Sequence, residues 1–441
     1  MNLSPLRARL EQYFEFQNLS TNWRTEILAG ATTFATMAYI VFVNPSILGE
    51  AGMPVAAVAA ATCLSAALGS LLMGAFARYP IALAPGMGLN AYFTYAVVKG
   101  MGVAWQTALG AVFLSGVIFM ALTFVGVRQL IVQAIPRELF AAVAAGVGLF
   151  IAWIGFRNAG IIVPHPATTL TLGNLRDPKT ALALFGLAAI AALLAWGARG
   201  AMLAGILLTT AVGFGLGIVD WQPRAFSLAE LSATAFRLDV VSTLRIGLVE
   251  IVFVFLFVDL FDNVGTLVAV GKKAGLFDQE NQIPRLNRIL MSDATATIVG
   301  SLAGTSTVVS YIESSAGVAA GGRSGVTAIV TGLLFLLALF VAPLAGAIPP
   351  SATAPALIVV GSFMMSAVSE VRWSDPVIAI PAFLTMLAIP LTFSIANGLA
   401  FGFTAFTVLK VLRGEFRQVN GFVYGLTLLF ILRFLYLARG A

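Results

Sequence analysis

The sequence is poor in charged residues, in cysteine and in histidine. Only 10% of its 441 residues are Asp, Glu, Lys or Arg, and it holds one cysteine, Cys63, and one histidine, His165. A single cysteine excludes an intrachain disulfide and a cysteine-based metal site. A single histidine excludes a histidine cluster that would bind a metal or relay protons. We therefore expect neither a metal ion nor a cofactor.

Apolar residues are abundant instead. They make up 59% of the chain, and the mean hydropathy is +0.97. This composition predicts an all-α polytopic membrane protein. The net charge of +6 comes from Lys and Arg in loops, which favours contact with the lipid bilayer and not with nucleic acid. Residues 1–24 lack the apolar core of a cleavable signal, and 3–16 predict an amphipathic helix at the cytoplasmic interface.

Fourteen apolar stretches are candidates for membrane spans, two of them interrupted. In chain order they are 26–47, 54–77, 81–98 (interrupted), 105–126, 138–157, 180–197, 201–220, 246–271, 287–303, 304–320 (interrupted), 325–347, 352–369, 375–391 and 394–412. A last run, 421–438, is expected to lie along the interface or the bundle edge. Basic loop residues such as Arg78, Arg199 and Lys273 fall on one side. The positive-inside rule makes that side the cytoplasm, with both termini there, in the cytoplasmic (inner) membrane.

The two halves of the chain share a pattern. A Gly-Ser-Leu string at 69–71 precedes the first interrupted span, and the same string at 300–302 precedes the second. Seven spans precede residue 225 and seven follow 245, and an odd number per half places the halves in opposite orientations. Inverted halves with interrupted spans at matching positions are typical of secondary transporters, whose site lies near the bilayer midplane.

The two interrupted spans cannot be continuous helices. The third contains Pro80, Pro85, Gly86 and Gly88, and proline removes an amide donor and clashes with the preceding helical turn. The tenth begins with β-branched and hydroxyl residues at 305–310, which favour an extended strand. We expect a short strand followed by a half-helix in each span, with non-helical backbone facing protein or a wet cavity.

An acidic stripe lies inside the eighth span. Asp259, Asp262, Asn263 and Thr266 fall at helical spacing on one face of the predicted helix. A carboxylate at bilayer depth costs several kcal/mol unless it is protonated, paired or wet, so it indicates a functional site. With the two half-helices alongside, the expected pocket is lined by Asn90, Asp259, Asp262, Ser310 and Glu313.

The predicted pocket has carboxylates, an amide and hydroxyls but no lysine or arginine on its spans. It suits a neutral heterocycle with several N–H donors, together with a proton or, less favourably, a sodium ion. Nearby aromatic residues, such as Tyr92 and Phe255, could stack on such a ring. An inverted-repeat transporter of sulfate or bicarbonate is the main alternative. An intramembrane enzyme with paired aspartates, or a channel, fits less well.

The residues of three segments resemble those of the AzgA-like purine permeases, a branch of the nucleobase transporters related to the uracil and xanthine permeases. These segments are APGMGLNAYF at 84–93, FVDLFDNVGTL at 257–267 and GTSTVVSYIES at 304–314. The resemblance extends from residue 18 to about residue 414. It implies seven plus seven inverted spans, proton-coupled uptake of adenine, guanine or hypoxanthine, an elevator movement and a homodimer.

The resemblance also implies a domain division and residue roles. The core domain would comprise 25–126 and 246–347, and the gate domain 138–220 and 352–412, with 421–438 as a C-terminal apolar segment. Asp259 and Glu313 are implied to be base-binding acids, and Asn90 the binding-site amide. Asp262 is implied to be an acid needed for transport, and Gly88 a small residue beside the site. Ser310 is a weaker candidate from its position alone.

Overall fold

The computed structural model describes residues 4–125, 135–219, 228–245, 249–276 and 283–440. Predicted span ends at 126, 220 and 246–248 lie outside these residues. Within the described residues, nine helices are long and apolar enough to cross a membrane. The predicted all-α membrane fold, with short strands in the third and tenth spans, is confirmed. The count of fourteen spans stays a prediction.

Helices occupy every uninterrupted span predicted in the first half. They are α2 (Trp23–Met37) with α3 (Ile40–Gly49), α4 (Val55–Leu72) with the π-helix η1 (Met73–Ala77), α6 (Trp105–Val125), α8 (Arg137–Asn158), α9 (Pro178–Ala195) and α10 (Ala201–Gly215). Local chemistry sets several boundaries. Asn22 caps α2 by accepting the amide of Thr25, and Asp177 caps α9 ahead of Pro178 at the first helical position. A hairpin of β2 (Ile162–His165) and β3 (Thr169–Leu172) joins α8 to α9.

The second half has the same sequence of helices. They are α12 (Val249–Ala274), α13 (Leu286–Ala303), α15 (Gly325–Ala338) with the 3-10 helix η4 (Leu339–Ala347), α16 (Pro350–Met364) with η5 (Met365–Glu370), α17 (Pro376–Thr392) and α18 (Ile395–Leu412). Before them, η3 (Leu228–Ala233) and α11 (Val240–Arg245) form short helical turns. Ser324 caps α15, and Asp375 caps α17.

Each interrupted span is a strand followed by a short helix, as predicted. The third consists of β1 (Leu83–Pro85), α5 (Met87–Ala91) and the π-helix η2 (Tyr92–Gly100); the tenth consists of β4 (Val308–Ser310) and α14 (Ser314–Ala319). The strands pair with each other in antiparallel register, with Ala84 opposite Val309. This pairing satisfies backbone groups that have no helical partner at membrane depth.

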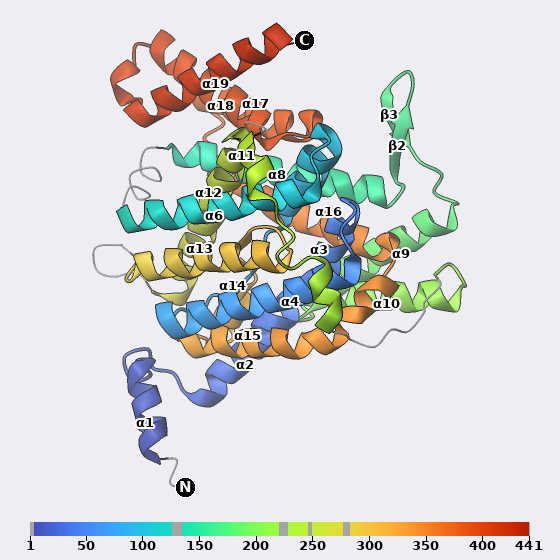
Figure 1. Ribbon diagram of the computed structural model, residues 1–441, viewed down its shortest axis with the longest axis vertical. Helices are drawn as coiled ribbons and strands as arrows, with labels where there is room; N and C mark the ends of the chain where they lie inside the picture. The colour runs from blue at the N-terminus through green and yellow to red at the C-terminus, as the bar shows by residue number, and fades with distance from the viewer. Residues whose placement is uncertain (1–3, 126–134, 220–227, 246–248, 277–282, 441) are drawn as a thin grey trace.

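The two halves interleave. In Figure 1, α6, α13, α4 and α15 form a row of roughly parallel helices, each in contact with the next, and α2 continues it beside α15. The members of this row come alternately from the first and second halves. A second group joins α8 to α16 and α17, with α9 and α10 on α16 and α18 on α17. The inverted-repeat chain therefore builds two helix groups, each from both halves.

Small residues allow the second group to pack tightly. A Cβ atom on Gly361 of α16 would lie 2.4 Å from the carbonyl oxygen of Gly148 on α8. Because glycine has no Cβ, the two backbones approach as closely as in other membrane helix pairs with small interfacial residues. The small-residue run at 144–148 is thus a packing surface.

The two groups also meet at a polar cluster around Glu50, the residue that follows α3. Its carboxylate accepts hydrogen bonds from Lys99 Nζ at 2.5 Å, from the Tyr95 hydroxyl at 2.7 Å and from Asn158 Nδ2 at 2.8 Å. Asn158 also donates to the Tyr95 hydroxyl at 3.1 Å. Glu50 directly follows α3 and Tyr95 and Lys99 lie in η2, whereas Asn158 ends α8. The Glu50 cluster therefore ties the fifth span to the first and third.

Terminal helices lie at opposite ends of the molecule (Figure 1). α1 (Ser4–Tyr13) lies outside the bundle and is attached through Glu15, whose carboxylate pairs with Arg78 at 3.0 Å and Arg285 at 3.3 Å. Hydrogen bonds from Arg7 and Trp23 hold the pKa of Glu11 on α1 below its ordinary value. At the other end, α19 (Gly421–Gly440) packs against α18, where the hydroxyls of Thr427 and Thr407 are 2.7 Å apart.

Candidate functional site

The candidate site is built around the β1–β4 strand pair. Beyond the ladder itself, Gly86 N donates to the Thr307 carbonyl at 2.9 Å, and Tyr311 N donates to the Ala82 carbonyl at 3.0 Å. The Tyr311 hydroxyl donates to the carbonyl of Pro85 at 2.5 Å. β-branched valines in β4 and Pro85 in β1 favour this extended backbone. α12 packs against α5, β4 and α14, so the elements that carry the predicted site residues do meet.

Asn90 is the clearest unsatisfied group in this region. It lies in α5 and its side chain is 0% exposed. Neither its Oδ1 nor its Nδ2 has a hydrogen-bond partner among the described residues. A buried amide left unpaired costs about 1–3 kcal/mol. An amide kept at such a cost is suited to bind a ligand that brings both a donor and an acceptor.

Gly88 lies two residues before Asn90 and faces α8. A Cβ atom at this position would lie 2.4 Å from Cγ1 of Val147. That separation is far shorter than a normal carbon–carbon contact of about 3.5–4.0 Å. The structure thus gives Gly88 a packing reason, the close approach of the third span to α8. Its predicted place beside the ligand stays a prediction.

The acidic stripe of α12 is part of a buried hydrogen-bond network. Asp259 is 1% exposed, and its Oδ1 accepts from Asn263 Nδ2 at 2.8 Å. The same Nδ2 atom donates to Oδ2 of Asp293 on α13 at 2.6 Å. Asn263 Oδ1 accepts the amide of Ser310 on β4 at 2.9 Å. One amide side chain therefore links two carboxyl groups and the strand pair.

The other predicted site residues, Ser310, Asp262 and Glu313, differ in their contacts. Ser310 is 3% exposed, and its hydroxyl has no hydrogen-bond partner among the residues that the structure describes. Asp262 is half-buried, and it is near enough to Tyr311 to interact with it electrostatically. Glu313 acts on Tyr311 in the same way. Asp262 and Glu313 therefore both lie in the surroundings of Tyr311.

Glu313 lies just before α14 and is half-buried. Its Oε1 accepts a hydrogen bond from the hydroxyl of Tyr39 at 2.5 Å. Tyr39 lies at the junction of α2 and α3 and is 1% exposed. The two acids predicted to bind a base thus have different side-chain partners, Asn263 for Asp259 and Tyr39 for Glu313.

Sequence reasoning did not assign Tyr39, Asn263 or Asp293 to the site. Asn263 carried a usable signal, because it belongs to the polar stripe of the eighth span. Asp293 lies outside the polar stripe of the eighth span, and the structure joins it to Asp259 through Asn263. Tyr39 carried no signal, since a tyrosine in an apolar span is ordinary.

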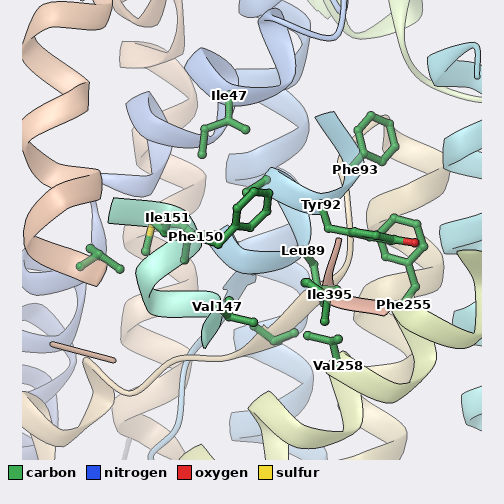
Figure 2. Close-up of a cluster of buried hydrophobic side chains, with 14 of the residues drawn as sticks. Ile47, Leu89, Tyr92, Phe93, Val147, Phe150, Ile151, Phe255, Val258 and Ile395 are labelled. Carbon is green, nitrogen blue, oxygen red and sulfur yellow. The ribbon is translucent and has the colours of Figure 1, made fainter. Parts of the chain in front are cut away.

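Apolar side chains pack around the elements that carry the candidate site residues. Figure 2 shows them in one buried cluster, contributed by the third span (Leu89, Tyr92, Phe93), by α12 (Phe255, Val258), by α8 (Val147, Phe150, Ile151) and by α18 (Ile395). The rings of Tyr92 and Phe255 meet edge to face at 5.3 Å between centroids. These two rings, expected to stack on a ligand, thus pack against each other here.

The site residues are acids, amides and hydroxyls. In the described part of the chain, no three His, Cys, Asp or Glu side chains are grouped as a metal ion would require. Carboxylates and hydroxyls accept N–H groups, and an amide both donates and accepts. The arrangement can therefore recognise a neutral polar ring and hold protons on its carboxyl groups.

The amino-acid sequence matches known permeases over most of its length. The family model Xan_ur_permease, described as the Permease family, matches residues 24–401. The chain is 44% identical over 440 residues to guanine/hypoxanthine permease PbuG of Bacillus subtilis, covering 97% of this chain and 100% of that protein. It is 43% identical over 431 residues to adenine permease AdeP of Escherichia coli, covering 98% and 97%. The predicted resemblance to purine permeases is confirmed.

Solved structures share the fold at low sequence identity. The transmembrane domain of a cyanobacterial bicarbonate transporter, BicA, superposes with a TM-score of 0.63 at 15% identity, covering 88% of this chain and 98% of that domain. At this identity the likeness concerns the fold alone. It supports the inverted-repeat architecture predicted from the two interrupted spans.

Proposed function

The chain belongs to the permease family, and we propose that it is a proton-coupled importer of purine nucleobases: adenine, guanine or hypoxanthine. Members of this family are transporters and not enzymes, and this chain is a polytopic membrane protein. The purine assignment is supported by the relatives named adenine and guanine/hypoxanthine permeases. It is supported independently by the chemistry of the site.

The observation that carries the proposal is the buried, unpaired amide of Asn90 on α5, a helix that packs against α12, which bears the acidic stripe. A purine edge offers N–H donors next to ring-nitrogen or carbonyl acceptors, and an amide complements both. Asn90 has both polar atoms unpaired among the described residues. A site built to hydrogen-bond a polar edge rejects ligands without it, because its buried groups then stay unpaired. We assign Asn90 to the base edge, and Asp259 and Glu313 to base N–H groups.

Proton coupling follows from the number of carboxyl groups in a low-dielectric setting. Asp259 and Asp293 accept from the same Asn263 amide nitrogen, and two close carboxylates at bilayer depth cannot both stay ionised cheaply. A proton held among these groups can travel with the base. Glu313 and Asp262, which both interact electrostatically with Tyr311, are the other carboxyl groups proposed to take part in proton coupling. Ser310 and Gly88 complete the proposed site, the first with its free hydroxyl and the second by leaving room.

The proposed transport movement is an elevator. The helix row that includes α4, α6, α13 and α15 corresponds to the core domain, 25–126 and 246–347. The group around α8 corresponds to the gate domain, 138–220 and 352–412. The apolar cluster of Figure 2 brings side chains of the third span and α12 together with side chains of α8, so much of the contact between the two groups is apolar. We further propose a homodimer in the cytoplasmic membrane, with both termini in the cytoplasm.

The alternative of a sulfate or bicarbonate transporter has less support. The shared fold with a bicarbonate transporter is the one observation that favours it. A fold does not determine which substrate is carried. The candidate site presents Asp259, Asp262, Asp293 and Glu313, and these acids would repel an anion.

Radiolabelled uptake tests the proposal. Cells without their own purine uptake would express the chain and be given tritiated adenine, guanine or hypoxanthine at several pH values. We expect saturable uptake of at least one purine that falls as the external pH rises. Glu313→Gln and Asp259→Asn should each lower uptake by at least about tenfold. Glu370→Gln, the same change at an exposed site, is the matched control. Normal uptake and pH dependence in both site variants would contradict the assignment, as would sulfate or bicarbonate uptake without purine uptake.

A further inference from the structure

Tyr39 makes a contact that its sequence position does not suggest. It lies in the first span, 274 residues before Glu313, and its hydroxyl donates to Glu313 Oε1 at 2.5 Å. This distance is typical of a charge-assisted O–H···O⁻ hydrogen bond. Its side chain is 1% exposed, within the main hydrophobic cluster, so surrounding side chains restrict the ring. The hydroxyl is therefore held against the carboxylate from a fixed direction.

Two other buried tyrosines use their hydroxyls differently. Tyr311, two residues before Glu313, donates to the backbone carbonyl of Pro85 at 2.5 Å and so braces β1. Tyr79 donates to the backbone carbonyl of Pro284 at 2.7 Å. Both support the backbone. Tyr39 instead contacts a side-chain carboxylate of the candidate site.

We propose that Tyr39 is a positioning residue that orients the carboxylate of Glu313 to accept an N–H group of the purine. This inference rests on the proposed function. A tyrosine hydroxyl has one proton to donate, and here that proton goes to Oε1. A carboxylate has about four acceptor positions, so after this hydrogen bond acceptor positions remain for the ligand. With Oε1 fixed, the carboxylate plane no longer rotates freely, and the ligand loses less free energy in ordering it.

The proposal also explains why Glu313 is restrained by a residue from another span, whereas Asp259 is restrained by a residue on its own helix. Asp259 lies on a continuous helix, buried, with Asn263 one turn away on the same helix. Glu313 lies before a helix of only six residues, is half-buried and has a longer side chain. A longer side chain at a helix boundary has more rotamers to lose on binding. Tyr39 supplies the restraint from a different span.

Equilibrium binding to purified protein tests this role. The ligand would be whichever of tritiated adenine, guanine or hypoxanthine the wild-type protein binds. Tyr39→Phe removes only the hydroxyl and should weaken binding about tenfold. Tyr79→Phe, which also removes a buried tyrosine hydroxyl bonded to protein, is the matched control and should bind within about twofold of wild type. Tyr39→His retains a ring N–H donor and should recover part of the lost affinity.

Each outcome decides between the alternatives. Binding by Tyr39→Phe within twofold of wild type overturns the proposal, and so does an equal loss in Tyr39→Phe and Tyr79→Phe, which indicates a general effect on stability. If Tyr39→Phe does not fold, Tyr39→His decides, since the proposal requires it to bind more weakly than Tyr79→Phe. Failure of the wild-type protein to bind any of the three purines overturns the proposed function, and the inference with it.

Discussion

Gly88→Ala offers a sharp test of the contact between the third span and α8. The added Cβ would lie 2.4 Å from Cγ1 of Val147, whereas the next nearest atoms, of Ile151 and Val147 itself, are 3.9 Å away. One methyl group therefore causes the whole clash. Val147 is 1% exposed, and a β-branched side chain has few alternative rotamers on a helix. The clash cannot be relieved by rotating into open space.

The expected magnitude follows from two opposing effects. Overpacking a buried site costs about 1–3 kcal/mol, and replacing a helical glycine by alanine returns up to about 1 kcal/mol. We therefore expect Gly88→Ala to destabilise the protein by about 1–2 kcal/mol. Val147→Ala removes the clashing methyl group and leaves a small cavity on its own. In the double variant the new methyl occupies that cavity, so the two changes should couple favourably by about 1–3 kcal/mol.

The assay is thermal unfolding of purified protein in detergent, alongside purine uptake, for the wild type, both single variants and the double variant. Gly88→Ala should lower the melting midpoint, and Val147→Ala added to it should raise the midpoint again. Additive losses in the double variant would refute the packing explanation. If Gly88→Ala abolishes purine binding at an unchanged midpoint, Gly88 acts at the ligand instead.

Three further predictions concern amide side chains. Asn90→Leu should weaken purine binding by about tenfold or more yet leave the melting midpoint equal or higher, since it removes a buried unpaired amide; a parallel loss of both would mean that Asn90 is structural. Asn263→Leu should lower the midpoint strongly, because it leaves two carboxyl groups without their shared donor; an unchanged midpoint would contradict the network. Asn158→Leu should change the maximal uptake rate more than the dissociation constant, because it loosens the Glu50 cluster away from the site; a change in affinity alone would contradict that role.

The parts of the fold that were predicted from the sequence are those that local chemistry determines. Prolines and glycines at 80–88 exclude a continuous helix, and the valines of 308–309 favour a strand, so both interruptions were predicted at the right positions. The polar spacing of the eighth span predicted one continuous helix face, and α12 has it. The π-helical turns of η1 and η2 were not predicted, because they have no composition of their own.

The parts of the site that were missed depend on contacts between distant segments. Tyr39 and Glu313 are 274 residues apart, and Asn263 and Asp293 are 30 residues apart on different helices. Nothing local distinguishes Tyr39 from other aromatic residues of an apolar span. Asp293 is the single acid on its helix, so no polar stripe marks it in the sequence. Such residues become visible only when the packing of the spans is known.

The β1–β4 pair has a consequence for how the protein is made. The strand formed by residues 83–85 forms its ladder with residues 308–310, and about 220 residues of chain lie between the two strands. During synthesis the third span enters the membrane long before its partner strand exists. Unpaired amides and carbonyls are costly in hydrocarbon, so the third span must stay shielded by other protein until the tenth arrives. A chain truncated before residue 308 should therefore be degraded, although all of its first seven spans are present.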